Sequence, residues 1–269
     1  MPSWLLEILD PLPLATAAMY FSLFFLVVAW TGVIFVRPFF RLWLRSQARL
    51  NEVVTAASAG FYLFYGLLLG LLSVAAYSNA RDISGFVGRE AAELVSIYRS
   101  TTSYPEAVRE EVRHLLRDYT VYVVDREWPS YQEGRVPLGG YNRLQAIRET
   151  LLAFEPQTRT QEITHTAVLK AFNDMVTLRQ QRLAGVDASI PAALWYTVAI
   201  GGLITVVFLL LLDMRLGLHL FTTGMITTFL GLMVFIIYAQ DRPLRNEIGA
   251  SAAPFVAAYE MVMRWDDTP

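Results

Sequence analysis

The sequence predicts an all-α integral membrane protein with four transmembrane helices and a helical extramembrane domain inserted between the second and third spans. Three observations lead to this fold class. Of the 269 residues, 55% are hydrophobic and 17% are charged, whereas soluble domains carry about 25% charged residues. Four long apolar stretches contain no Asp, Glu, Lys or Arg. The 111 residues between the second and third stretches instead hold 14 basic and 15 acidic residues.

The first predicted domain, residues 1–78, contains two spans, at 12–36 and 53–78. Each exceeds the roughly 20 residues that a helix needs to cross the hydrocarbon core. No basic residue precedes the first span, which argues against a cleaved signal peptide. Both spans are therefore expected to stay in the membrane.

The linker between these spans carries arginines at every fourth position, which places them on one stripe of a helix. Aromatic side chains fall on the opposite side. One interpretation is an amphipathic helix whose arginines face anionic lipid. The other is a ring of positive charge that attracts anions, if several subunits surround a pore. Both remain open for Arg37, Arg41, Arg45 and Arg49.

The second domain, residues 79–189, is predicted to be helical because apolar residues recur at helical spacing between Pro and Gly breaks. The expected helices are 79–102, which continues the second span, 105–127, 141–154 and 160–184. Acidic residues here often adjoin arginines, as in Asp125-Arg126-Glu127. We expect such residues to form surface ion pairs rather than an acid–base couple.

The third domain, residues 190–240, contains spans at 190–212 and 216–240, and residues 241–269 form a C-terminal tail. Only Asp213 to Arg215 connect the two spans, so they form an antiparallel hairpin. His219 is the only ionisable residue in the four stretches. It is a candidate for function, or else a hydrogen-bonded histidine near the membrane surface.

Composition and motifs exclude several classes of function. The net charge of −2 lacks the basic excess of a nucleic-acid binder. The absence of cysteine excludes thiolate chemistry, and the three histidines lack metal-ligand spacing. We therefore expect no enzyme, no metal site and no cofactor. Because the first three spans contain no ionisable residue, proton pumping and voltage sensing are disfavoured.

The second span carries the most informative pattern. Its small residues Gly60, Gly66 and Gly70 would let helices approach closely. Tyr62, Tyr65 and Leu69 share one face, with Ser58 on the same stripe. These four residues could line a hydrophobic constriction that gates by dewetting. Alternatively, they face lipid or the next helix.

Short segments that follow one another along nearly the whole chain resemble a single family. That family is the bestrophin-like family of bacterial membrane proteins, distant relatives of the bestrophin anion channels. The segments are Asn51-Glu52, Tyr77, Ala80-Arg81, Arg89-Glu90-Ala91, Tyr98-Arg99, Tyr119 to Pro129, Arg179 to Leu183, Pro191 to Trp195 and Asp241-Arg242-Pro243. Two features differ from bestrophins. Pro243-Leu244-Arg245 stands where they have Pro-Phe-Gly, and their acidic calcium clasp has no counterpart, so calcium gating is not implied.

The resemblance implies a homo-oligomer, a pentamer of four-span subunits, that passes small anions such as chloride through a neck on the second span. It also implies a multi-pass protein in the lipid bilayer of the inner membrane. Both termini and residues 79–189 would face the cytoplasm, a sidedness that charge alone leaves undecided. Trp128 and Pro243 are expected to be structural.

A second class of function stays open beside the channel. The chain could be a non-conducting membrane scaffold or regulatory protein. Its helical domain, which has a mixed-charge surface, would then bind a partner protein.

Overall fold

The computed structural model describes residues 13–44, 49–244 and 249–264, and all regular structure in these ranges is helical. The chain divides into two compact units. The membrane unit comprises residues 1–78 and 189–241, and the helical unit comprises residues 79–188 and 242–269. One uninterrupted helix, α4 (Leu50–Ser100), contributes to both, which confirms that the second span continues into the middle domain.

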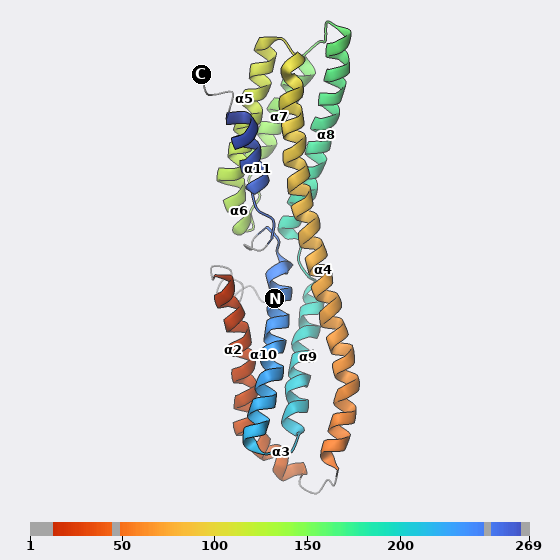
Figure 1. Ribbon diagram of the computed structural model, residues 1–269, viewed down its shortest axis with the longest axis vertical. Helices are drawn as coiled ribbons and strands as arrows, with labels where there is room; N and C mark the ends of the chain where they lie inside the picture. The colour runs from red at the N-terminus through yellow and green to blue at the C-terminus, as the bar shows by residue number, and fades with distance from the viewer. Residues whose placement is uncertain (1–12, 45–48, 245–248, 265–269) are drawn as a thin grey trace. The chain divides into compact units, whose positions relative to one another are not determined.

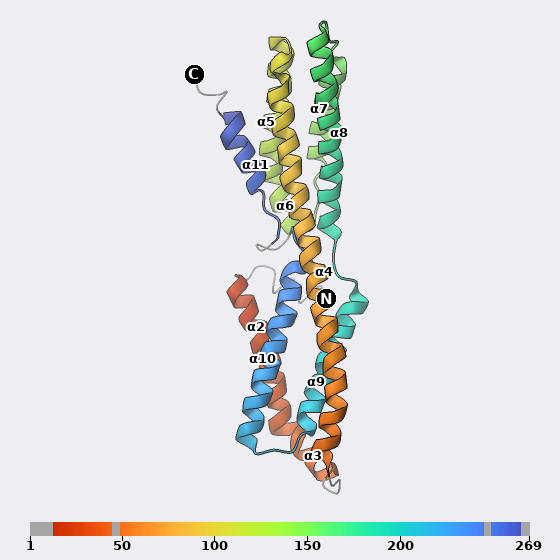
Figure 2. The same ribbon diagram turned by 45° about the vertical axis from the view of Figure 1, so that its right-hand side comes forward.

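The membrane unit contains the four expected spans. Its elements are α2 (Leu14–Thr31), η1 (Gly32–Val36), α3 (Arg37–Leu44), the first part of α4, α9 (Ala192–Leu211) and α10 (Leu216–Asp241). Four helices are long and apolar enough to cross a bilayer, namely Ala15–Leu42, Leu50–Ser103, Ala192–Leu211 and Leu216–Asp241. Within this unit α2 lies beside α10, and α4 lies beside α9 (Figures 1 and 2).

Glycines on α10 allow α2 to pack closely against it. A Cβ at Gly231 would lie 2.7 Å from the Cα of Ser22, so the two backbones are in contact there. Phe21 of α2 fills the neighbouring space, with its ring centroid 5.2 Å from that of Tyr238. Close backbone approach at small residues is how helices associate in lipid, where the hydrophobic effect does not drive them together.

Asp241 joins the beginning of α9 to the end of α10. Its carboxylate accepts hydrogen bonds from the Ile190 backbone N–H and from Trp195 Nε1, the latter at 3.2 Å. Pro191, whose missing N–H is no loss before a first helical turn, precedes α9. The predicted hairpin of the third and fourth spans is thus closed at both ends, by its short loop and by Asp241.

The helical unit is built around the second part of α4. Helices α5 (Glu106–Tyr122), α6 (Trp128–Gln132), α7 (Gly139–Ala153), α8 (Arg159–Asp187) and α11 (Ala253–Ala258) accompany it, with η2 (Thr101–Ser103), η3 (Val123–Glu127) and η4 (Tyr259–Met263). The Thr158 side chain caps α8 by accepting a hydrogen bond from the Gln161 N–H. The core includes the fully buried residues Leu94, Ile97, Val112, Leu116, Ile147, Leu151, Met175 and Phe255.

The predicted helices of this unit agree with the structure except at one break. The range 105–127 corresponds to α5 followed by η3, and the ranges 141–154 and 160–184 correspond to α7 and α8. A break was expected at Trp128-Pro129, but the chain continues into α6. Pro129 lies in the first turn of that helix, where proline is tolerated.

A Gly231→Ala substitution tests the α2–α10 contact. The added methyl group would force the two backbones apart, so we expect the protein to lose about 1–3 kcal/mol of stability. Thermal unfolding in detergent, followed by circular dichroism, measures this loss. The matched control is Gly60→Ala, since nothing lies within 4 Å of a Cβ at Gly60. Equal effects of the two substitutions would contradict the packing described here.

Candidate functional site

One face of α4 is buried along almost its whole length. In the membrane unit the buried residues recur at spacings of three, four or seven, at Val54, Ser58, Tyr65, Leu69, Leu72 and Ala76. In the helical unit the same spacing continues at Ala80, Ile83, Val87, Ala91, Leu94 and Tyr98. This is the period of a helix with a single packed stripe.

Tyr65 is the centre of this stripe in the membrane unit. Its hydroxyl donates a hydrogen bond to the Val198 carbonyl at 2.9 Å. Its ring stacks on that of Phe61, with the two ring centroids 5.5 Å apart. A Cβ at Gly201 would lie 2.2 Å from the Tyr65 ring. Gly201 therefore provides the space that lets α4 pack against α9.

The predicted neck residues belong to this packed side of α4. Tyr65 and Leu69 are 7% and 5% exposed and lie in the apolar interior of the membrane unit. Ser58 is buried and bonds the Thr55 carbonyl, while Tyr62 is half-buried against Phe208. Within one chain, Tyr65 and Leu69 therefore pack against the other helices of the membrane unit.

The opposite face of α4 is uncovered. Leu67, at the middle of this face, is 58% exposed. We call the set of large apolar residues there the outer stripe, which consists of Leu63, Leu67, Leu71 and Val74. Beside them, no described atom lies within 4 Å of a Cβ at Gly60, Gly66 or Gly70. These three glycines therefore serve no helix contact inside the described part of one chain.

Arg37 turns inward instead of facing lipid or a pore. It is 4% exposed, and it donates hydrogen bonds to the Met214 carbonyl and to Asp213 Oδ1, the latter at 3.3 Å. Asn51 holds the same loop by bonding both the backbone carbonyl and the N–H of Asp213, each at 2.8 Å. Arg37 and Asn51 thus fix the α9–α10 loop against α3 and the beginning of α4.

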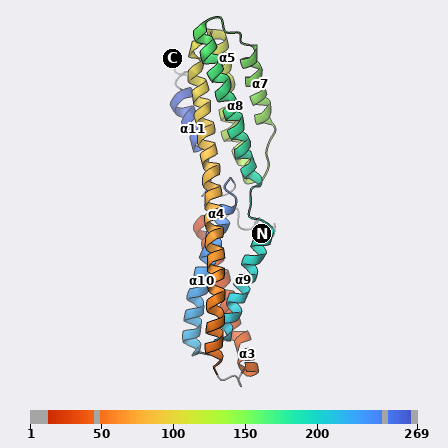
Figure 3. The same ribbon diagram turned by 90° about the vertical axis from the view of Figure 1, so that its right-hand side faces the viewer.

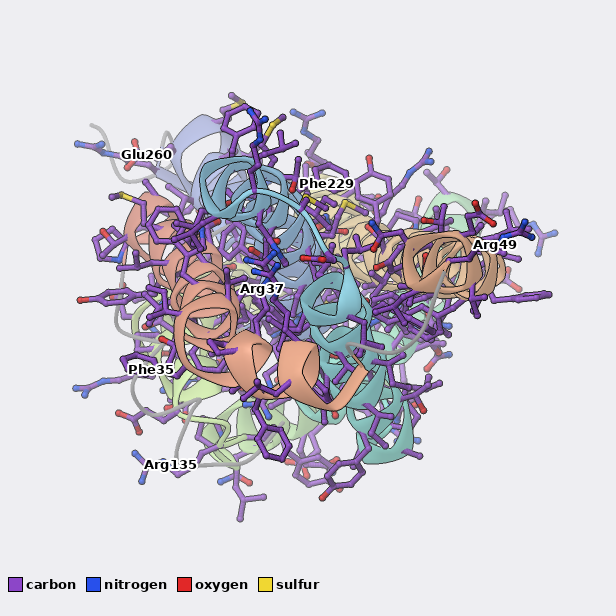
Figure 4. The ribbon with its side chains drawn as sticks, turned by 90° about the horizontal axis from the view of Figure 1, so that it is seen from below. Phe35, Arg37, Arg49, Arg135, Phe229 and Glu260 are labelled. Atoms are coloured by element: carbon purple, nitrogen blue, oxygen red, sulfur yellow. The ribbon has the colours of Figure 1, made fainter. Side chains whose placement is uncertain are left out.

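The remaining arginines of the linker differ from Arg37. Arg41 Nε lies 3.2 Å from Asp213 Oδ1 but is 59% exposed, and Arg49 is 80% exposed beside Glu52. Figure 4 shows Arg37 directed toward the α9–α10 loop and Arg49 at the outer edge. Arg45 lies outside the described residues. His219 is fully buried, and its Nε2 lies 3.0 Å from the Leu209 carbonyl oxygen, within hydrogen-bonding distance.

The helical unit encloses a buried network of four charges, which we call the charge network: Glu90, Glu127, Arg179 and Arg182. Arg182 binds both carboxylate oxygens of Glu90, at 2.6 and 3.0 Å. Arg179 binds both oxygens of Glu127, at 2.8 and 2.6 Å. Bidentate pairs of this kind are among the strongest hydrogen-bonded contacts in proteins.

Two buried tyrosines complete the charge network. Tyr119 donates to Glu90 Oε1 at 2.6 Å and Tyr131 donates to Glu127 Oε2 at 2.7 Å. Each tyrosine also accepts a bond from an arginine, so α4, α5, η3, α6 and α8 meet at one point. Burial raises the pKa of both hydroxyls, which therefore remain protonated donors.

The expectation of surface pairs is wrong for Glu127. Asp125 and Arg126 are exposed, but Glu127 is fully buried, because it falls four residues after Val123 on the apolar stripe of α5 and η3. That position was the available sequence signal, since a charged residue on an apolar stripe needs a buried partner. Burial alone would raise the pKa of Glu127, but Arg179 and then Arg182 outweigh it and hold that pKa below its ordinary value.

Trp128 and Pro243 are both found in packed surroundings. Trp128 packs against the core of the helical unit, and its ring lies 5.8 Å from the Arg182 guanidinium carbon. The Pro243 carbonyl accepts a hydrogen bond from the Ala250 N–H at 2.7 Å. Among the described residues, no group of three His, Asp or Glu side chains is arranged to hold a metal ion.

Comparison with known proteins agrees with this architecture. Residues 23–255 match the family profile of the bestrophin-like domain. A bestrophin homologue from Klebsiella pneumoniae, solved as point variants, shares 13% identity in one variant, with a TM-score of 0.59 over 92% of this chain and 96% of that chain. Another variant gives a TM-score of 0.61 at 12% identity, over 90% of this chain and 98% of that chain.

A second solved structure, described only as a membrane protein, is similar to the same degree. It shares 12% identity with a TM-score of 0.61, over 90% of this chain and 96% of that chain. None of the curated proteins matches the chain in sequence. At these identities, the solved structures establish a common fold.

Removing one member of the charge network should destabilise the helical unit strongly. We expect Arg182→Gln to lose about 3–5 kcal/mol, because Glu90 would remain buried without its cation. Arg99→Gln, at an exposed position on α4, should change stability by less than about 0.5 kcal/mol. Thermal unfolding of the two variants gives the comparison. Similar midpoints would show that the charge network contributes little.

Acid should weaken the fold through Glu127. Because its pKa is lowered in the folded state, the unfolded chain takes up a proton first as the pH falls. The contribution of Glu127 is thus complete at neutral pH and declines below about pH 4.3, the ordinary pKa of glutamate. Chemical unfolding between pH 7 and pH 3.5 measures this decline. In Glu127→Gln it should be smaller, although that variant is less stable at pH 7; an unchanged profile would argue against this role.

Proposed function

This chain belongs to the bestrophin-like family, and we propose that it is one subunit of a homo-oligomeric anion channel. The resemblance implies a ring of five subunits around a pore. The observation that carries the proposal is the outer stripe of α4, which is apolar, has glycines beside it and has side chains that are 58–70% exposed. A face of this kind in one subunit suits a central axis lined by several copies.

The outer stripe supplies a better neck than the stripe of Tyr62, Tyr65 and Leu69. A narrow apolar ring blocks ions by excluding water, and widening it or making it polar lowers that barrier. Leu63, Leu67 and Leu71 are spaced by four residues, so copies around an axis would form successive rings. Tyr65 and Leu69 then orient the outer stripe indirectly, because their packing on the opposite face fixes the rotation of α4 about its own axis.

The arginines of the linker divide between two roles in this proposal. Arg37 is structural, since it is buried against the α9–α10 loop. Arg41 and Arg49 remain exposed enough to contact anionic head groups or to attract small anions. Their position near the beginning of α4 places them at one end of the spans, where the field of a cation acts on the pore entrance or on the lipid surface.

We further propose that the protein lies in the inner membrane, with both termini and the helical unit in the cytoplasm. The resemblance supports this orientation. The balanced charges of residues 79–189 suit an aqueous compartment, and an even number of spans returns the C-terminus to the side of the N-terminus.

Halide flux in proteoliposomes tests the proposed neck. In Leu67→Ser the ring becomes wider and polar, so chloride flux should rise by about tenfold, the effect of lowering a barrier by roughly 1.4 kcal/mol. The matched control is Leu203→Ser on α9, which makes the same change at a leucine that is 63% exposed. It should leave the flux unchanged.

Two results would contradict the proposal. If both serine variants alter the flux equally, the outer stripe has no special role. If the pure protein passes no anion in any variant, while the helical unit retains a stoichiometric protein partner, the scaffold function is favoured instead.

A further inference from the structure

The helical unit contains a groove that plays no part in the proposed channel. Helices α7 and α8 lie side by side (Figure 3). The groove lies between these helices and residues 136–138, and its volume is about 340 Å³. Pockets for small organic ligands usually measure about 300–1,000 Å³. The groove is therefore large enough for a small molecule.

The floor and one rim of the groove are apolar. Leu144 and Phe172 are buried at its floor. At the rim, Leu138 and Tyr141 are 79% and 67% exposed. The apolar surface of the groove therefore continues from its floor to its rim.

One lining residue of the groove, Arg148, carries a positive charge that no carboxylate balances, whereas Arg179 is paired with Glu127. Arg148 on α7 is exposed and makes no hydrogen bond or ion pair within the described residues. Arg179, a member of the charge network, also lines the groove, and its Nε donates no hydrogen bond in the described chain. The described lining contains no Asp or Glu. A bound molecule would thus meet an apolar floor and two guanidinium groups.

We propose that this groove binds a small organic anion with an apolar body and a carboxylate head. The guanidinium of Arg148 matches a carboxylate in shape and charge, since it offers two parallel N–H donors. The apolar body would rest on Phe172 and Leu144, with the amides of Asn173 and Gln180 at the edge.

Binding there would act directly on the charge network. Arg179 faces the groove and also holds Glu127, which lies in η3. A ligand that contacts Arg179 favours the folded arrangement of α8 and η3, and ligands that bind only the folded state raise its stability. A ligand in the groove would therefore stabilise the helical unit.

Titration calorimetry of the full-length protein in lipid nanodiscs tests the proposal, with 4-phenylbutanoate as the probe and the uncharged 4-phenylbutanamide as its control. The carboxylate should bind, and Arg148→Gln should weaken it by about tenfold, as expected for the loss of a charge-assisted pair. Arg99→Gln removes another exposed charge, outside the groove, and should leave the affinity unchanged. Asn173→Trp, at an exposed rim position, should block binding of both probes.

The test measures binding and so gives the same answer whether or not the protein conducts anions. Absence of binding at millimolar carboxylate would overturn the proposal, as would equal affinities for the carboxylate and the amide. An Arg148→Gln variant that binds as tightly as the wild type would do the same. So would a single-particle map in which a segment of a neighbouring subunit fills the groove.

Discussion

The structure depends on one helix, α4, that packs two interiors with a single face. Tyr65, Leu69 and Leu72 lie in the core of the membrane unit, and Val87, Leu94 and Tyr98 continue the same stripe in the helical unit. Because the helix is unbroken from Leu50 to Ser100, a rotation of its first part about the helix axis would displace the packed residues Tyr65, Leu69 and Leu72 together. The register of α4 therefore decides which residues remain uncovered, and these form the outer stripe.

Two different kinds of contact hold that register. In the membrane unit, close packing holds the register of α4. The Tyr65 ring lies against Gly201, and its hydroxyl donates a hydrogen bond to the Val198 carbonyl. In the helical unit, an ion pair holds the register of α4, because Arg182 donates hydrogen bonds to both carboxylate oxygens of Glu90. Lipid offers no hydrophobic drive between helices, whereas a buried ion pair specifies its partner strongly once neither charge can reach water.

The sequence predicted the architecture well because the four apolar stretches, the Pro and Gly breaks and the continuous second span all follow from local chemistry. It did not show which face of α4 packs inside the chain, for a physical reason. Within a bilayer, both the packed and the lipid-facing sides of a helix are apolar, so Tyr65 and Leu67 look equally suitable from spacing alone. The charge network was also missed, although Glu127 on the stripe of α5 and η3 was a visible signal. The role of Gly201 required knowledge of its neighbour Tyr65 on a distant segment.

Single-particle imaging of the purified protein in nanodiscs, viewed along the membrane normal, tests the central claim most directly. The account predicts a closed ring of copies in which Leu63, Leu67 and Leu71 of each α4 face the axis, while Tyr65 and Leu69 pack within each subunit. A dimer, or a ring in which the outer stripe faces lipid and other helices fill the centre, would contradict it.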